Sequence, residues 1–152
     1  MKKILKFVPM ILVMAVIFAF SAMPGEESAQ TSFRILKVLA AWIEDMSDAS
    51  VTSALAQNLH IIIRKVAHFS EYFLLGVTTY YAFKDRFLYD RKWFYITIIS
   101  ICVLFAASDE IHQHYVPGRY GTPTDVLIDS AGALTGIAIC LLFAHRRKHE
   151  KI

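Results

Sequence analysis

The chain has 152 residues, of which 56% are hydrophobic and 19% are charged, and its formal net charge is +3. Its apolar residues form long runs, and crossing a bilayer takes about 17 to 25 such residues. The positive charge is concentrated in a few short segments, so it does not indicate a nucleic-acid-binding protein. These features predict a single membrane domain over residues 1–152.

Four apolar stretches approach the length of a membrane-spanning helix. They cover about residues 7–23, 66–83, 93–109 and 126–144. The first could instead be a secretory signal, because lysines precede it and the small residues Ala19 and Ser21 stand near its end. It is longer than a usual signal core, which favours a first membrane helix. The predicted fold is all-α, an integral membrane bundle of four transmembrane helices.

The segment between the first two predicted spans is expected to contain short amphipathic helices. Thr31 or Ser32 is a candidate N-cap. One helical face then carries Phe33, Leu36, Ala40 and Ile43. A second helix is predicted from Val51 through Ile63, running into the second span. Both are expected to lie on the outer leaflet, with a mobile loop as the alternative.

Lysine and arginine are concentrated in three segments, and their positions predict the orientation in the membrane. The segments are residues 2–6, 84–92 and 146–151. Short basic loops stay in the cytoplasm, and four spans place all three segments on that side. We therefore predict a multi-pass protein of the cell membrane with both termini cytoplasmic and with residues 24–65 and 110–124 outside.

The two cysteines are predicted to form no disulfide bond. Cys102 and Cys140 lie at different depths when counted from the outer ends of their spans. A disulfide bond needs Cα atoms within about 7 Å of each other, which this offset does not allow. We interpret both residues as small apolar side chains inside the bundle.

Ionisable side chains stand at the outer ends of the last three predicted spans, so they are expected to meet at one depth. His68 and Glu71 are three residues apart and share a helix face. The acids at this depth are Glu71, Asp109, Glu110, Asp125 and Asp129, and the cations are Arg64, Lys65 and Arg119. Ionisable groups in a membrane are costly and indicate a functional site. A network of ion pairs that only fixes helix packing is the alternative.

One face of the last predicted span combines these acids with glycine. Asp125 and Asp129 are followed on the same face by Gly132 and Gly136. Small residues four positions apart let a neighbouring helix approach closely. We therefore expect another helix to pack against this face.

Several chemistries are open to the predicted outer cluster. His68 could act as a general acid or base oriented by Glu71 or an aspartate, so His68, Glu71, Asp109 and Glu110 are candidate catalytic residues. His68 and Glu71 with Asp109 or Asp129 could also ligate a divalent metal. We assign no metal site and no cofactor from the sequence, and no nucleophile motif accompanies the cluster.

Three further residues lie between the last two predicted spans. His112 and His114 are two apart, which makes them a weak ligand pair, and we expect them in a loop near lipid headgroups. Arg119 lies in the turn PGRYGTP, and its guanidinium suits a phosphate or a carboxylate. A headgroup anchor or a partner of Asp125 is the alternative for Arg119.

Three blocks of the chain resemble the VanZ-like family of bacterial membrane proteins, whose namesake is associated with low-level teicoplanin resistance. They are FAFSAMPGEES at the end of the first span, RKVAHFSEYFLLG at residues 64–76 and SDEIHQHYVPGRYGTPTDVLIDSAGALTG at residues 108–136. The matching motif positions are Lys65, His68, Glu71, Tyr72, Asp109, Glu110, Gln113, Gly118, Arg119, Asp125, Asp129 and Gly132. Met23 stands where the family often has glutamine, and Asp129 where asparagine is common.

The resemblance implies a cell-envelope protein that contributes to glycopeptide resistance through an extracytoplasmic polar site. The binding residues that it implies are Lys65, Tyr72, Gln113, Arg119, Asp125 and Asp129. It supplies no reaction. One hypothesis is a membrane enzyme that modifies a lipid or lipid-linked envelope precursor, with His68, Glu71 and Asp109 as acid–base or metal-binding groups. The other is a non-catalytic module that shields or alters the antibiotic's target. The expected partners are membrane lipids and a lipid or cell-wall precursor or glycopeptide target, and not nucleic acid.

Overall fold

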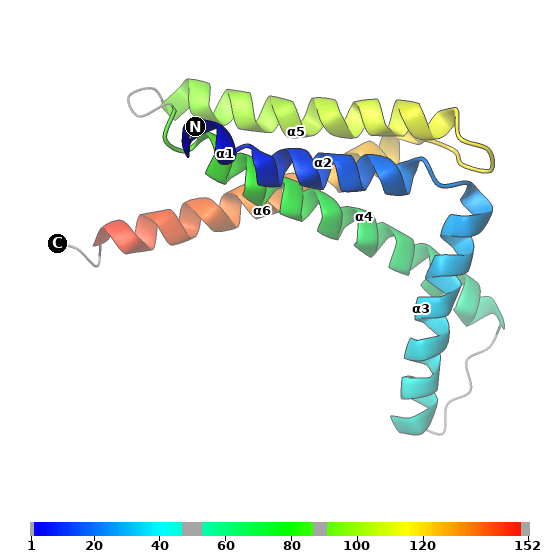
Figure 1. Cartoon of the computed structure of the whole chain (residues 1–152). Helices are drawn as coiled ribbons and strands as arrows, with labels where there is room; N and C mark the ends of the chain where they lie inside the picture. The colour runs from blue at the N-terminus through cyan, green and yellow to red at the C-terminus, as the bar shows by residue number, and fades with distance from the viewer. Residues whose placement is uncertain (1, 47–52, 87–90, 150–152) are drawn as a thin grey trace.

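The computed structural model describes residues 2–46, 53–86 and 91–149, and over these ranges the protein is helical with no β-strand. The elements are α1 (Lys2–Leu5), α2 (Val8–Ser21), α3 (Gly25–Met46), α4 (Ser53–Phe83), α5 (Arg91–His114) and α6 (Pro123–His149). Helices α2, α4, α5 and α6 form a bundle, and α3 turns away from it (Figure 1). Helix α4 is central, because it contacts α2, α3, α5 and α6.

Within the described ranges, two helices, α5 and α6, are each long and apolar enough to cross a membrane. The pair Val8–Ser21 and Gly25–Val38 also qualifies if it is counted as one span, although it is bent by 104°. The predicted first span, residues 7–23, is therefore a shorter helix than expected. Helix α2 has 14 residues, which corresponds to a length of about 21 Å. The described residues thus contain two or three candidate spans rather than the predicted four.

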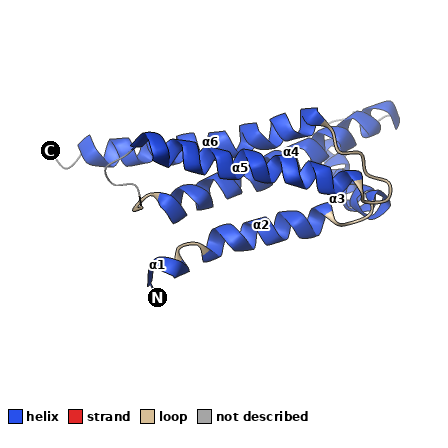
Figure 2. Cartoon of the chain, turned by 90° about the horizontal axis from the view of Figure 1, so that it is seen from above, coloured by secondary structure: helices blue, strands red, loops and turns tan. Residues whose placement is uncertain are grey.

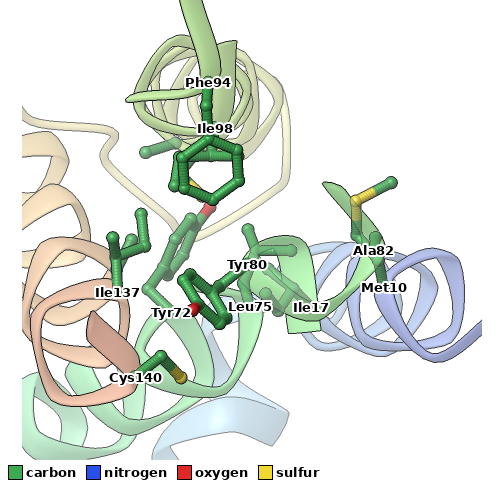
Figure 3. Close-up of a cluster of buried hydrophobic side chains, with 13 residues drawn as sticks. Met10, Ile17, Tyr72, Leu75, Tyr80, Ala82, Phe94, Ile98, Ile137 and Cys140 are labelled. Carbon is green, nitrogen blue, oxygen red and sulfur yellow. The ribbon is translucent and has the colours of Figure 1, made fainter. Parts of the chain in front are cut away.

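Helix α4 is not one of these candidates because polar side chains interrupt its apolar sequence. It nevertheless runs unbroken for 31 residues and includes the predicted second span, residues 66–83. Its Tyr72, Thr79 and Tyr80 are buried between helices, and Figure 3 shows the two tyrosines there. Polar groups that face other helices lower the hydropathy of α4 without facing the surroundings of the bundle.

The predicted start of the first amphipathic helix at Thr31 or Ser32 is wrong, because α3 begins at Gly25. Two acids, Glu26 and Glu27, stand in its first turn, where negative charge is favourable. The hydroxyls of Thr31 and Ser32 donate hydrogen bonds to backbone carbonyls four residues earlier, each at 3.1 Å. Thr31 and Ser32 therefore lie within the helix and do not act as its N-cap.

Other parts of the prediction for this segment agree with the structure. Leu36, on the predicted apolar face, is buried, whereas Phe33 on the same face is exposed. The side chains of Ala40 and Ile43 lie outside the described ones. The second predicted helix is continuous with the second span, since α4 is one helix from Ser53 to Phe83. Val51 and Thr52, where that helix was predicted to begin, lie outside the described residues.

The core lies where α2, α4, α5 and α6 meet. Ile17, Tyr72, Leu75, Ile98 and Ile137 are buried there, one or two from each helix (Figure 3). Large apolar side chains also cover much of the outer surface. Examples from α5 and α6 are Leu104, Leu127, Leu142 and Phe143. An apolar exterior around a partly polar interior suits a helix bundle surrounded by lipid.

The predicted close approach to α6 is present, and α4 is the partner helix. A Cβ atom added to Gly132 would lie 2.4 Å from the carbonyl oxygen of Phe69, and one on Gly136 would lie 2.3 Å from that of Phe73. Gly76 of α4 makes the reciprocal approach, since a Cβ atom added to it would lie 2.1 Å from the carbonyl oxygen of Ala133 in α6. The two backbones are therefore in direct contact, as small residues allow.

The two ends of the bundle differ in what they contain. The start of α1, the end of α4, the start of α5 and the end of α6 lie at one end, and the α2–α3 junction and the α5–α6 loop lie at the other (Figures 1 and 2). At the first end Lys6 pairs with Asp85, and the Arg86 guanidinium lies 5.1 Å from the Phe7 ring centroid. The described parts of the three predicted basic segments, residues 2–6, 84–86, 91–92 and 146–149, thus lie at this end.

Candidate functional site

Polar side chains from four helices gather at the end of the bundle that holds the α5–α6 loop, and this site includes every predicted site residue. Six are buried: Tyr72, Asp109, Glu110, Gln113, Arg119 and Asp129. Four are partly exposed: Lys65, His68, Glu71 and Asp125. The side chains that are scattered along the sequence therefore form one cluster.

Hydrogen bonds in the buried part of the site join the end of α2 to the last turns of α5. The Ser21 hydroxyl donates to Oδ2 of Asp109 at 2.8 Å. The Gln113 amide donates to the same Asp109 oxygen at 3.1 Å and lies 3.2 Å from Oε1 of Glu110. Sequence reasoning missed Ser21, which it treated only as a small residue near a possible cleavage site. Its position as a hydroxyl residue closing an apolar run was the available signal.

Arg119 fastens the α5–α6 loop to the end of α2. Its Nε donates to the carbonyl of Met23 at 2.8 Å, and Nη2 donates to the carbonyl of Phe20 at 2.7 Å. Its Nη1 donates to Oε1 of Gln113 at 3.2 Å. Because the Met23 contact uses the backbone, the absence of glutamine at that position does not remove it. The structure thus gives Arg119 a positioning role within the protein.

The charge of Arg119 is retained in this buried setting. Burial lowers the pKa of the guanidinium, and nearby Arg64 lowers it further, while Asp109 and Glu110 act in the opposite direction. The ordinary pKa of arginine is so high that the side chain stays protonated. Arg119 therefore contributes a fixed positive charge beside the acids of the site.

The start of α6 is built as a helix cap that also carries an ion pair. Thr122 precedes Pro123, and its Oγ1 accepts a hydrogen bond from the Asp125 backbone N–H at 3.2 Å and donates to Oδ2 of Asp125 at 2.9 Å. Asp125 also pairs with Lys65 of α4 at 3.4 Å. The Thr122 N–H donates to Oε2 of Glu110 at 2.9 Å. These contacts fix where α6 enters the site.

Three buried carboxylates lie close together at the centre of the site. One oxygen each of Asp109, Glu110 and Asp129 lies within 4.8 Å of the other two. Two full negative charges at this separation repel by about 3 kcal/mol at an effective dielectric constant of 20. Asp129 is 0% exposed, and neither of its oxygens has a hydrogen-bond partner among the described residues. Its nearest basic atom is Nδ1 of His68, 3.8 Å from Oδ1.

The predicted loop position of His112 and His114 is wrong, because both belong to the last turn of α5. The His112 ring stacks on Phe18 of α2 with 4.3 Å between centroids. His114 is exposed and meets the ring of Tyr115 edge to face. The helix continues past the predicted end of the span because Asp109, Glu110 and Gln113 find partners inside the bundle.

Two cavities adjoin the cluster. One of about 260 Å³ lies between α2, α3 and α4, where Phe20, Ile35 and Ile63 provide apolar walls. His68, Glu71 and Arg119 line its polar part. A second cavity of about 390 Å³ lies between α4 and α6 and is lined by charged residues that include Arg64, Lys65, Asp125 and Asp129. His68 borders both cavities and so lies between them.

A helical bundle with an apolar exterior, two or three candidate spans and buried polar groups at one end is a membrane-associated protein. The VanZ/LLP1 family profile matches residues 6–144, so the chain belongs to this family. The resemblance found in the three sequence blocks is thereby confirmed. Comparisons with curated proteins and with solved structures give no match.

Proposed function

We propose that the protein is a bacterial cell-envelope protein that contributes to tolerance of teicoplanin-type glycopeptides through the polar site at the outer ends of α4, α5 and α6. Membership of the VanZ/LLP1 family supports the class of protein. The buried acids and the adjoining cavities support a site that binds a ligand, since groups needed only for packing would pair with one another. We propose that residues 1–152 form a single domain.

The proposal includes four membrane crossings with both termini in the cytoplasm. In this arrangement α2 and α4 cross the membrane beside α5 and α6, with the polar face of α4 turned toward the bundle. The start of α1, the end of α4 and the end of α6 lie at one end of the bundle and carry basic residues, which supports this orientation because basic segments stay in the cytoplasm. The polar site then faces outward.

Cysteine labelling of intact cells tests this orientation. We expect Tyr120→Cys to react with a membrane-impermeant maleimide, because Tyr120 is exposed in the α5–α6 loop. We expect Arg146→Cys to react only after the cells are permeabilised. The native thiols, Cys102 and Cys140, are buried, and the unsubstituted protein measures their background. Labelling of both variants from the same side would contradict four crossings.

The cavity between α2, α3 and α4 is the observation that supports a particular class of ligand. Its apolar walls suit a hydrocarbon chain, and the side chains of His68, Glu71 and Arg119 suit a polar or charged head group. An amphiphile satisfies both parts at once. We therefore propose that the ligand is a membrane lipid or a lipid-linked envelope precursor.

Isosteric changes in the polar part of the cavity test this role. We expect His68→Gln and Glu71→Gln to accumulate near the wild-type level, because both side chains are partly exposed and glutamine keeps a similar shape and hydrogen-bonding capacity. We expect both variants to lose most of the protection against teicoplanin. Membrane abundance and inhibitory concentration are measured on the same cultures.

Glu26→Gln is the matched control, because Glu26 is exposed at the start of α3 and lies outside both cavities. It should keep both abundance and protection. If loss of protection follows loss of abundance across the His68 and Glu71 variants, the cluster serves packing and the proposed role is wrong.

An enzyme that modifies the lipid or lipid-linked precursor is the second candidate. The position of His68 between the two cavities, with Glu71 one turn away and Asp129 at 3.8 Å, favours it because a general acid–base needs such partners. Expression level distinguishes the two candidates. A catalyst protects at low copy number, whereas protection by a binding protein that shields the target rises in proportion to its amount.

A further inference from the structure

Among the described residues, no lysine or arginine side chain donates a hydrogen bond to the three central carboxylates. Asp109 and Glu110 accept hydrogen bonds from neutral groups, namely Ser21, Gln113 and the backbone of Thr122. Arg119 donates to backbone carbonyls and to Gln113, and Lys65 pairs with Asp125. Arg64, the third cation near the site, lines the two cavities. The acids therefore share a buried region in which none of them forms a direct ion pair with a described lysine or arginine.

Unsatisfied atoms point to the same region. Oδ1 of Asp109 and both carboxylate oxygens of Asp129 are buried and lack hydrogen-bond partners among the described residues. Independently, the Tyr72 hydroxyl on α4 is 0% exposed and lacks a hydrogen-bond partner among the described residues. Nδ1 of His68 is also unpartnered and lies 3.8 Å from Asp129. Polar groups from α4, α5 and α6 that lack hydrogen-bond partners thus lie in one buried region.

The spacing of the acids suits a metal ion. A cation equidistant from three oxygens that are 4.8 Å apart lies about 2.8 Å from each, and small side-chain rotations shorten this to the 2.0–2.6 Å of Mg²⁺ and Ca²⁺ complexes. Carboxylate and hydroxyl oxygens are the ligands that Mg²⁺, Mn²⁺ and Ca²⁺ prefer, and an imidazole is compatible with Mn²⁺. Thiolates, which would favour softer metals, are absent from the cluster.

We propose that Asp109, Glu110 and Asp129 bind a divalent cation of the Mg²⁺, Mn²⁺ or Ca²⁺ class, with Tyr72 and His68 next to it. The ion would offset two of the three negative charges and hold α5 against α6 at the outer end of the bundle. The sequence suggested a metal set centred on His68 and Glu71 and assigned no site. The set proposed here consists instead of three acids, two of which are adjacent in α5.

Direct titration with Mn²⁺ tests the proposal. The full-length protein is purified in detergent, treated with EDTA and desalted, and free Mn²⁺ is then measured by electron paramagnetic resonance. We expect one saturable Mn²⁺ ion per chain that excess Mg²⁺ or Ca²⁺ displaces. Asp129→Asn should weaken binding by at least about tenfold, since loss of even an outer ligand partner costs 10–100-fold. Asp85→Asn, which removes an acid at the opposite end of the bundle, should leave binding unchanged.

Shared protons are the competing way to neutralise the acids. In that case the wild-type protein shows no saturable Mn²⁺ binding, and infrared spectra show a protonated carboxyl band that Asp129→Asn changes. Absence of saturable Mn²⁺ binding to the wild-type protein overturns the proposal. This measurement can be made even if Asp129→Asn does not fold. Equal binding by Asp129→Asn and wild type overturns it as well. The assay uses no antibiotic, so it tests the metal site separately from the proposed glycopeptide role. Either proposal can be wrong while the other is right.

Discussion

Replacement of Gly136 by leucine is expected to prevent the protein from accumulating in the membrane. A Cβ atom at this position would lie 2.3 Å from the Phe73 carbonyl oxygen and 3.1 Å from the Val77 nitrogen, both in the backbone of α4. Rotation of side chains cannot relieve contacts with a backbone, so α4 and α6 must separate. The cost therefore exceeds the ~1–3 kcal/mol of ordinary overpacking. Immunoblots of isolated membranes and size-exclusion profiles in detergent measure the effect.

Ala131→Leu is the matched control for Gly136→Leu. It adds a larger side chain to the same helix, but Ala131 is exposed on the outer face of α6. This variant should accumulate as the wild type does, because added apolar volume meets lipid. Equal accumulation of both variants would show that the glycine face of α6 does not pack on α4.

The second large effect is expected from Arg119→Leu, which removes the fastening between the α5–α6 loop and α2. The carbonyl of Met23 and the amide oxygen of Gln113 would lose the donors from Arg119, and the Phe20 carbonyl would keep only the Met23 N–H at 3.3 Å. Each buried acceptor left without a partner costs about 1–3 kcal/mol, so the variant should lose roughly 2 kcal/mol or more. The apparent midpoint of thermal unfolding in detergent should fall accordingly.

Two further variants separate the geometry of Arg119 from its charge. Arg34→Leu removes one positive charge from an exposed position on α3 and should leave the unfolding midpoint unchanged. Arg119→Lys keeps the charge but lacks the planar fork that reaches three acceptors, so it should recover only part of the loss. Full recovery by lysine would show that charge alone stabilises the loop.

The helical architecture could be predicted from the sequence, because helix formation depends on local patterns of apolar residues. The apolar runs at residues 93–109 and 126–144 became α5 and α6, which extend them at both ends. Spacing also predicted the packing face, since Gly132 and Gly136 recur at the helical period and both meet α4. Likewise, the charges at the ends of three apolar runs predicted that the acids would meet.

The start of α3 depended on a distant segment and was therefore missed. Thr31 and Ser32 can cap a helix or bond backward within one, and their sequence does not decide between the two. The decision comes from Gly25, whose N–H donates to the Pro117 carbonyl at 3.0 Å. A Cβ atom on Gly25 would lie 1.9 Å from the carbonyl oxygen of Gly118, so only glycine fits this approach. The contact joins residues that are more than 90 positions apart.

The partners within the site were unpredictable for a similar reason. Spacing places Asp109 at the end of a helix, but the rotation and depth of α2 decide that Ser21 reaches it. Arg119 has a fork that suits carboxylates, yet its acceptors are backbone carbonyls, which every residue possesses and no motif marks. Residue type thus indicated which side chains matter, and tertiary geometry decided what they bind.

The polar face of α4 has a consequence for the order of assembly during synthesis. Buried Tyr72 and Thr79 and the partly buried His68 and Glu71 make α4 a poor substrate for independent release into lipid. Its main partner, α6, begins at Pro123 and is therefore translated after α4 is complete. In the proposed arrangement with four crossings, α4 would therefore be retained by the insertion machinery, or by the earlier α2, until α5 and α6 emerge. Insertion would then be a cooperative event that finishes when the glycine face of the last helix docks.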